Sequence, residues 1–177
     1  MEKSISGVKI ELAKGDIASQ PDMQAIVNAA NAQLRTGGGV AGAIHSIAGP
    51  GLEEECRPMA PIKPGQAVIS SAHKLPNKYV IHCLGPVYGR DTPEDELLAN
   101  CYRNALKLAD EYKIESVAFP SISSGAFGYP VEEAARVAIS TIMKVIPELG
   151  NVRVIRMVLF SKRDLDVYSE ILPPAGL

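Results

Sequence analysis

Two glycine-rich segments contain the residue types best suited to hold a charged ligand. The first, Gly37-Gly38-Gly39, leads directly into residues 40–48, which have a helical pattern. The first turn of a helix has N–H groups without intrahelical acceptors, and the helix dipole makes that end positive. The segment could therefore bind an anion such as a phosphate. A flexible turn without a ligand is the alternative interpretation.

The same glycines give a nominal match to the dinucleotide-binding pattern G-x-G-x-x-G, at Gly37, Gly39 and Gly42. That fingerprint needs a strand directly before it and an acidic residue about 20 positions after it. Here the preceding strand ends too early and no acidic residue ends a second strand. The sequence therefore argues against a Rossmann-type site.

The second segment, residues 121–130, follows a predicted buried strand and precedes another helix. Its small residues would let the main chain approach a ligand, and Phe127 and Tyr129 could cover one. Two anion-ready turns at the carboxyl ends of strands predict a diphosphate held from both sides. Two ordinary strand–helix connections are the alternative.

A third feature is the string Asn28-Ala29-Ala30-Asn31, which follows a short apolar run. An amide group both donates and accepts hydrogen bonds, as recognition of a ribose diol requires. Asparagine also favours turns and helix caps, so a structural role is the alternative.

The histidines and cysteines do not have the pattern of a metal site or a disulfide framework. Zinc sites need three or four converging ligands, and paired cysteines usually show a characteristic spacing. The six residues concerned are His45, His73, His82, Cys56, Cys83 and Cys101. We expect no metal and no organic cofactor.

Length and composition limit the class of protein. The chain has 177 residues, and 18 basic against 20 acidic residues give a net charge of −2, which argues against a surface built for nucleic acid. We expect one globular domain over residues 1–177, with a frayed tail at 173–177. No apolar run approaches the roughly 18 residues that span a bilayer, and residues 1–7 have no signal core. The expected location is the cytoplasm.

Strand-like runs alternate with helical patterns along the chain, which is typical of an α/β domain. Apolar and β-branched runs predict strands at residues 8–13, 25–28, 67–72, 79–84, 116–120 and 154–160. Apolar residues at helical spacing predict helices at residues 40–48, 94–112, 130–145 and 166–171.

Taken together, these segments resemble the macro domains, a family that binds ADP-ribose. The set is specific although each string alone is weak, and residues 80–120 are also similar to the macro domain of a histone variant. The resemblance implies a three-layer α/β/α sandwich with a central, mixed six-stranded sheet. The matching strings are Gly15-Asp16-Ile17, Ile26-Val27-Asn28-Ala29-Ala30-Asn31, Gly37-Gly38-Gly39-Val40, Ala43-Ile44-His45, Phe119-Pro120-Ser121-Ile122-Ser123-Ser124-Gly125, Phe127-Gly128 and Val158-Leu159-Phe160.

The resemblance also implies how the ligand's adenine and its opposite end would be bound. Asp16 would accept a hydrogen bond from the adenine amino group, and the Ile17 N–H would reach a ring nitrogen. Phe160 would be a stacking platform for the base, and Phe127 would cover the distal end.

The diphosphate and the riboses would lie between the two glycine-rich segments. We name Asn31 and Gly39 as candidate catalytic residues, because the resemblance places them near the distal ribose, and Asn28 as a further ligand-binding residue. The remaining residues implied to line the diphosphate are Gly38 and Val40 on one side and Ser123, Ser124, Gly125, Ala126 and Phe127 on the other.

One position departs from the pattern of the efficient ADP-ribosyl-hydrolases in this family. They usually read Gly-Gly-Gly-Val-Asp-Gly, whereas this chain has Gly39-Val40-Ala41-Gly42. A carboxylate at that position could position or deprotonate a water molecule. In similar macro domains that have Val-Ala, the ligand's own phosphate is the group held to position the water, so orientation and electrostatics would remain the protein's part.

The expected function is therefore recognition of ADP-ribose, free or attached to proteins. Hydrolysis of mono-ADP-ribosyl esters on acidic side chains, or of O-acetyl-ADP-ribose, is the expected activity. A non-catalytic ADP-ribose reader is the alternative, and Ala41 favours it. The net charge disfavours a third interpretation, binding of RNA or poly(A).

Overall fold

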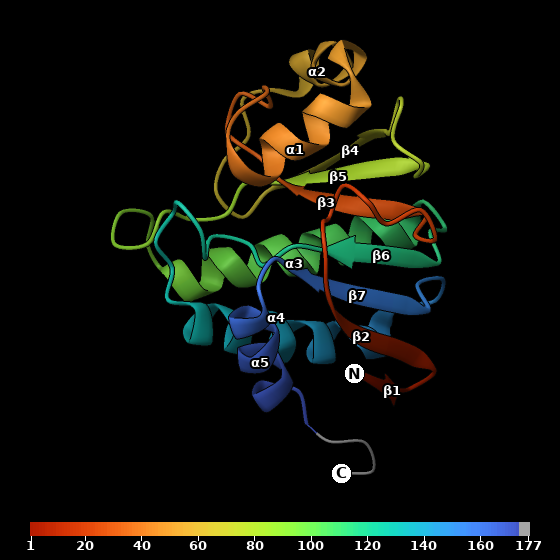
Figure 1. Cartoon of the computed structure of the whole chain (residues 1–177), viewed down its shortest axis with the longest axis vertical. Helices are drawn as coiled ribbons and strands as arrows, with labels where there is room; N and C mark the ends of the chain where they lie inside the picture. The colour runs from red at the N-terminus through yellow and green to blue at the C-terminus, as the bar shows by residue number, and fades with distance from the viewer. Residues whose placement is uncertain (174–177) are drawn as a thin grey trace.

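The computed structural model describes residues 1–173, which fold around one mixed β-sheet (Figure 1). The expected frayed segment, apart from Pro173, lies outside the described residues. The strands are β1 (Glu2–Ile5), β2 (Val8–Lys14), β3 (Ala25–Ala29), β4 (Ala67–Ser71), β5 (Tyr79–Cys83), β6 (Ser116–Phe119) and β7 (Val154–Leu159). The helices are α1 (Gly39–Ala48), α2 (Pro50–Cys56), α3 (Glu94–Glu111), α4 (Val131–Val145) and α5 (Lys162–Ile171), with 3-10 turns at Arg57–Met59 and Ile146–Glu148.

The strand order is β1-β2-β7-β6-β3-β5-β4. The five central strands are parallel to one another, and each edge strand is antiparallel to its neighbour. Because the five parallel strands point the same way, the loops after them emerge along one edge of the sheet. This edge carries every segment that the sequence marks as ligand-binding.

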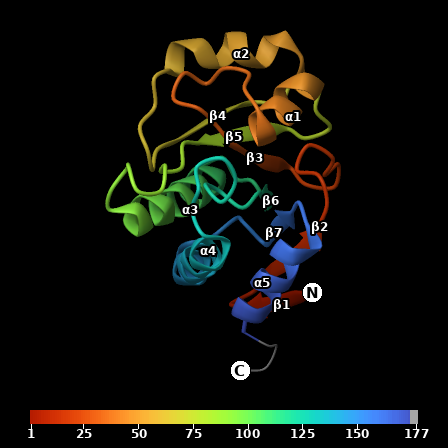
Figure 2. The same ribbon diagram turned by 60° about the vertical axis from the view of Figure 1, so that its left-hand side comes forward.

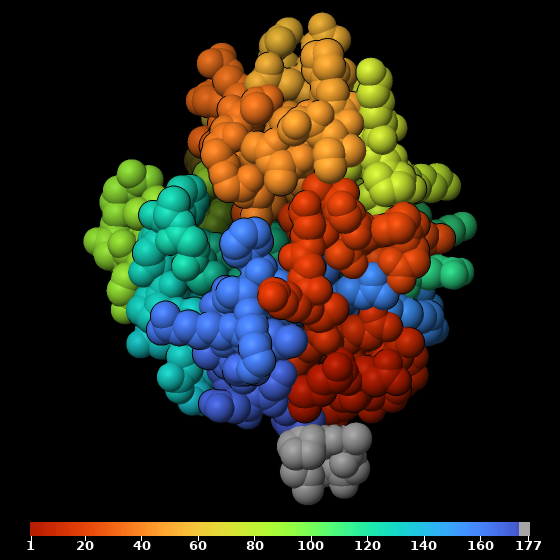
Figure 3. Space-filling model, in the orientation of Figure 1, coloured from red at the N-terminus to blue at the C-terminus, as the bar shows by residue number. Residues whose placement is uncertain are grey.

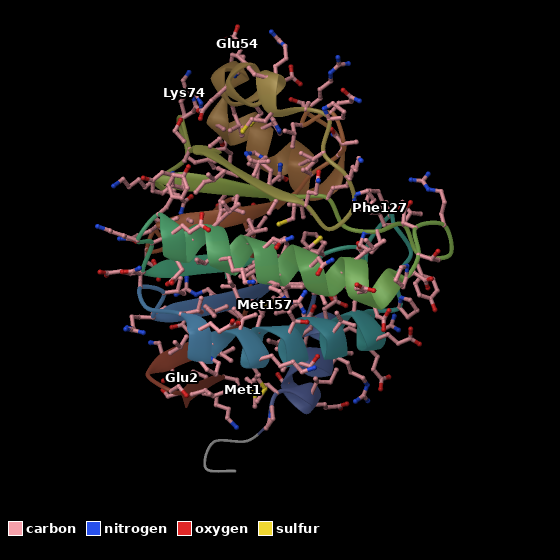
Figure 4. All side chains as sticks on the ribbon, turned by 180° about the vertical axis from the view of Figure 1, so that it is seen from behind. Met1, Glu2, Glu54, Lys74, Phe127 and Met157 are labelled. Atoms are coloured by element: carbon pink, nitrogen blue, oxygen red, sulfur yellow. The ribbon has the colours of Figure 1, made fainter. Side chains whose placement is uncertain are left out.

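Helices cover both faces of the sheet. On one face α3, α4 and α5 bury a cluster that includes Leu98, Ala138 and Tyr168. On the other face α1 and α2 bury a second cluster that includes Ile44 and Leu52. Figure 2 separates α1 and α2 from α3 and α4, and Figure 4 shows α3 and α4 crossing the back of the sheet. The predicted three-layer α/β/α architecture is confirmed.

The described residues form seven strands, so the expected number of six is wrong. The missed strand is β1, which has no apolar pattern because Lys3 is its only buried residue. It pairs with β2 across a two-residue turn in which Ser6 and Gly7 have φ values of 50° and 82°. Two positive φ angles suit the twist of a tight hairpin.

Two helices also differ from expectation. Helix α2 was not predicted, because Gly49-Pro50 resembles a helix stop, yet Pro50 occupies the first turn of that helix. Helix α5 begins four residues earlier than expected, at Lys162, where the Ser161 side chain accepts a hydrogen bond from the Asp164 N–H at 3.1 Å. Within residues 1–173, no helix combines the length and apolar character needed to cross a membrane.

Candidate functional site

Main-chain hydrogen bonds join the ends of neighbouring strands at the edge that carries the candidate segments. The Gly15 N–H donates to the Leu159 carbonyl at 2.9 Å, which ties the loop after β2 to the end of β7. The Ala30 N–H donates to the Cys83 carbonyl at 2.8 Å, which ties the end of β3 to β5. In Figure 3 the surfaces of the loops after β2, β3, β6 and β7, coloured red, orange, teal and blue, meet around a shallow hollow.

Phe127 links the loop after β6, which carries the second glycine-rich segment, to the layer that contains α1. It lies on the loop after β6, yet its half-buried side chain packs against the cluster beneath α1. Its carbonyl accepts a hydrogen bond from the Tyr88 N–H at 2.9 Å, which brings in the loop after β5. Figure 4 shows Phe127 at the end of the molecule where these loops lie.

The first glycine-rich segment forms the amino-terminal end of α1. Gly38 is the N-cap residue, and no side chain caps the helix. The first turn contains no acidic residue, and Gly39 has a φ of 56°, which favours glycine. The free N–H groups of this turn and the positive end of the helix dipole are therefore available to an anion.

Asn31 holds the turn that leads to this segment. Its Nδ2 donates to the Arg35 carbonyl at 2.8 Å, and its Oδ1 accepts from the Arg35 N–H at 2.9 Å. A primary amide has a second N–H and a second lone pair, so Asn31 retains one of each for a ligand. A Cβ built on Gly37 would lie 3.2 Å from Asn31 Nδ2 and 4.0 Å from Ala41 Cβ, so these three residues are neighbours.

The second segment presents a run of unpaired N–H groups. None of the main-chain N–H groups of residues 123–127 donates to another atom of the described residues. Gly125 and Ala126 are exposed. Ser123 has a φ of 66°, is 7% exposed, and its buried hydroxyl has no hydrogen-bond partner within residues 1–173. The segment can therefore offer several donors to one ligand.

Two buried tyrosines anchor the second segment from behind. The Tyr102 hydroxyl accepts from the Ile122 N–H at 3.1 Å, and the Tyr168 hydroxyl contacts Ser121 Oγ at 2.8 Å. Ser124 Oγ donates to Ser121 Oγ at 2.8 Å. Burial raises the pKa of Tyr168 to about 12, so its hydroxyl remains a neutral partner at physiological pH.

Sequence reasoning missed Gly85, which follows β5. A Cβ there would collide with Ser123, so the glycine allows the two loops to touch. The only signal in the sequence is the dipeptide Gly85-Pro86 directly after a strand, which marks a turn but no ligand.

Asp16, Ile17 and Phe160 lie at the neighbouring ends of β2 and β7. Asp16 is exposed, and its Oδ1 accepts from the Ala18 N–H at 2.9 Å, while its Oδ2 accepts from no group within residues 1–173. Ile17 is buried. Phe160 lies just beyond the end of β7 and is 88% exposed, which is unusual for a large aromatic side chain and is typical of a binding surface.

Asn28 lies in the core, and the structure does not bring its side chain to the cleft. It is 1% exposed, its Nδ2 donates to His82 Nδ1 at 3.1 Å, and its Oδ1 has no partner within the described residues. His82 Nε2 lies 2.9 Å from Ser70 Oγ, which itself donates to a carbonyl, so the imidazole donates here. Burial, followed by the charge of nearby His45, lowers the pKa of His82 to about 3.

Two cavities of the described residues lie away from these loops. One, of about 450 Å³, lies between α3 and β4 beside Met59 and Lys107. The other, of about 380 Å³, lies between α4 and the end of α5. No group of three or more His, Cys, Asp or Glu side chains in residues 1–173 is arranged to hold a metal ion.

Comparison with known proteins gives consistent matches. A family model described as the macro domain matches residues 27–138. The structure of the Oceanobacillus iheyensis macrodomain with ADP superimposes with a TM-score of 0.92 and 43% identity, covering 97% of this chain and 94% of that one. The structure of the Trypanosoma brucei macrodomain in complex with ADP-ribose superimposes with a TM-score of 0.86 and 34% identity, covering 93% of this chain and 69% of that one. The ADP-ribose glycohydrolase MACROD2 of Xenopus laevis is 43% identical over 95% of this chain and 42% of its own length.

Proposed function

This chain belongs to the macro domain family, and we propose from that premise that it binds ADP-ribose at the edge of the sheet described above. The observation that carries the proposal is the run of unpaired N–H groups in residues 123–127, beside the uncapped end of α1. Together they offer a diphosphate donors from two sides without a bound cation. The ADP and ADP-ribose complexes of similar macrodomains support this ligand.

The adenosine end of the ligand would lie at the ends of β2 and β7. Asp16 would accept from the adenine amino group through its free Oδ2, and the Ile17 N–H would donate to a ring nitrogen. The exposed ring of Phe160 would stack on the base. A specific base contact would explain why an exposed carboxylate and an exposed aromatic side chain follow the adjacent ends of β2 and β7.

The diphosphate would lie between the two glycine-rich segments, with the distal ribose at Asn31. Gly38, Gly39 and Val40 would donate from the first segment, and Ser123, Ser124, Gly125, Ala126 and Phe127 from the second. Asn28, which is buried, would support the Asn31 turn through β3 rather than contact the ligand through its side chain.

We further propose that the protein hydrolyses mono-ADP-ribosyl esters on acidic side chains, or O-acetyl-ADP-ribose. Water would attack at or near the distal ribose, with the ligand's phosphate holding the water and Asn31 orienting the ribose. Similarity to an ADP-ribose glycohydrolase supports hydrolysis. Ala41, which offers no carboxylate beside Asn31, favours the second candidate, a non-catalytic reader of ADP-ribosylated proteins.

Titration calorimetry with ADP-ribose and GDP-ribose tests the binding proposal directly. The wild-type protein should bind ADP-ribose and prefer it to GDP-ribose, because guanine presents a carbonyl where adenine presents an amino group. Asp16→Ala should bind ADP-ribose about tenfold more weakly, since the adenine amino group loses its acceptor. Asp166→Ala, which removes an exposed carboxylate on α5, is the matched control. Absence of ADP-ribose binding by the wild-type protein would contradict the proposal.

A further inference from the structure

A largely buried arginine on the central strand β7 holds the loop that carries Asp16 and Ile17. Arg156 has a side chain that is only 15% exposed. Its Nε donates to Glu11 Oε2 at 2.7 Å on the neighbouring strand β2. Its two terminal nitrogens donate to the Asp22 carboxylate at 2.8 and 2.7 Å, and Nη1 also donates to Gln20 Oε1 at 2.9 Å. The guanidinium therefore fixes one strand and two loop residues at once.

Gln20 links Arg156 to Asp16 through hydrogen bonds. Its Oε1 accepts from Arg156, and its Nε2 donates to the main-chain carbonyl of Asp16 at 2.9 Å. An arginine can only donate and a carbonyl can only accept, so the amide of Gln20 has one permitted orientation. Glutamine is the residue type that can join these two partners in this direction.

The Asp16 carbonyl matters because it shares a peptide plane with the Ile17 N–H. A trans peptide is planar, so its C=O and N–H point in opposite directions. A hydrogen bond that holds the Asp16 carbonyl therefore also sets the direction of the Ile17 N–H. That N–H donates to no atom of the described residues. The Ser19 N–H contributes a second hydrogen bond to the same carbonyl, at 3.0 Å.

We infer that Gln20, oriented by Arg156, is a positioning residue for recognition of the base. It aims the Ile17 N–H at the ring nitrogen beside the exocyclic group of the purine. That nitrogen is an acceptor in adenine, whereas it carries a proton in hypoxanthine and guanine, so a correctly aimed N–H selects adenine. The inference rests on the proposed function, because it specifies how the proposed ADP-ribose site distinguishes its base.

The loop has a second anchor that does not depend on the Gln20 side chain. Asn77 Nδ2 donates to the main-chain carbonyls of Gln20 and Met23, at 2.8 and 2.7 Å. A change confined to the Gln20 side chain therefore leaves the course of the loop supported. Because the Asn77 anchor does not involve the Gln20 side chain, substitutions of Gln20 test the positioning role without unfolding the segment.

The experiment compares the binding of ADP-ribose and inosine diphosphate ribose to Gln20→Glu. Glutamate keeps an acceptor for Arg156 but replaces the donor to Asp16 with an oxygen that repels the carbonyl. We expect ADP-ribose affinity to fall about fivefold, together with a smaller preference over the inosine ligand. Gln20→Met, which lacks the donor but adds no charge, should reduce the preference in the same way. Gln66→Glu, at the opposite edge of the sheet beside β4, is the control for added charge.

Three outcomes would overturn the inference or its premise, and they are distinguishable. Unchanged affinity and base preference in both Gln20 variants would overturn the positioning role while leaving ADP-ribose binding intact. Weaker binding with unchanged base preference would show a general loss of affinity that does not depend on the base, and it would also overturn the positioning role. A wild-type protein that does not bind ADP-ribose would overturn the proposed function itself.

Discussion

The main chain of Gly85 lies directly against the side-chain hydroxyl of Ser123. A Cβ on Gly85 would collide with Ser123 Oγ and with Cγ2 of Ile122. Ile122 is fully buried, so its Cγ2 cannot move aside without repacking the core. The close approach of the loop after β6 to the loop after β5 therefore requires that residue 85 has no side chain.

Gly85→Ala should displace this loop and with it the donors of residues 123–127. We expect ADP-ribose affinity to fall about tenfold or more and the melting temperature to drop by a few degrees, since overpacking costs roughly 1–3 kcal/mol. Calorimetry and thermal unfolding measure the two effects. Gly150→Ala is the control, because its Cβ would meet only Asp110 Oδ2, at 3.9 Å. Unchanged affinity in Gly85→Ala would show that binding does not need this contact.

Gly125→Glu should abolish detectable ADP-ribose binding while the protein remains folded. A Cβ on Gly125 meets no heavy atom within 4 Å, and its φ is outside the left-handed region, so the side chain is tolerated in the free protein. In the complex, the added carboxylate would lie beside the diphosphate and repel it. Ser140→Glu adds the same charge at an exposed position of α4 and should bind normally. Near wild-type affinity in Gly125→Glu would place the diphosphate elsewhere.

Acid should destabilise the fold through His82. Its pKa is about 3 in the folded protein, because burial and the nearby His45 oppose its charged form, against about 6.5 when unfolded. The unfolded chain therefore binds more protons below about pH 6.5, so stability is complete above that pH and is lost as the pH falls toward 3. The slope contributed by one such group approaches about 1.4 kcal/mol per pH unit.

Urea unfolding at pH 7.5, 6 and 5 measures this dependence. His82→Gln removes the titrating group and should flatten the pH dependence, although burial of the new amide lowers stability overall. His73→Gln changes a surface histidine that contacts Glu55, and it should retain the steeper wild-type dependence. Equal slopes in the wild-type protein and His82→Gln would refute the assignment to His82.

The central strands and most helices could be predicted because burial leaves a pattern in the sequence. Strand β5, for example, is an almost continuous buried run, as parallel strands covered on both faces require. Strand β1 could not be found in this way, since its pairing depends on main-chain bonds to β2 and its side chains are mostly polar. The turn at Ser6-Gly7 was the one usable signal.

Only part of the candidate site could be predicted from the sequence, for a related reason. Asn28 and Asn31 are the same residue type three positions apart, yet the Asn28 side chain pairs with His82 in the core and the Asn31 side chain bonds the main chain of Arg35 at the surface. Sequence alone does not show which partner β5 places beside Asn28. The contact between Gly85 and Ser123, and the link from Arg156 to Asp16 through Gln20, likewise exist only after the strands have assembled.

Asn31→Ala tests whether the site turns over its ligand. Wild-type protein should release ADP-ribose slowly from a Glu-linked acceptor protein, and Asn31→Ala should lose more of the release rate than of the affinity, because a misoriented ribose no longer presents its reacting carbon to the water. Asn31 also holds the turn at Arg35, so melting temperatures must be compared. An equal loss of rate and affinity would argue against an orienting role.

Ala41→Asp separates the hydrolase from the reader. Ala41 is 4% exposed and lies beside Gly37 and Asn31, so a carboxylate there would lie next to the proposed position of the distal ribose. The new carboxylate could accept a proton from the attacking water and so raise the hydrolysis rate. It could also repel the diphosphate and weaken binding. The rates are therefore compared at saturating substrate. Ser46→Asp adds an exposed carboxylate to the same helix and should leave the rate unchanged. Tight ADP-ribose binding with no release by the wild-type protein at high enzyme concentration would establish the reader. Release gained in Ala41→Asp would then show that the site lacks only this one group.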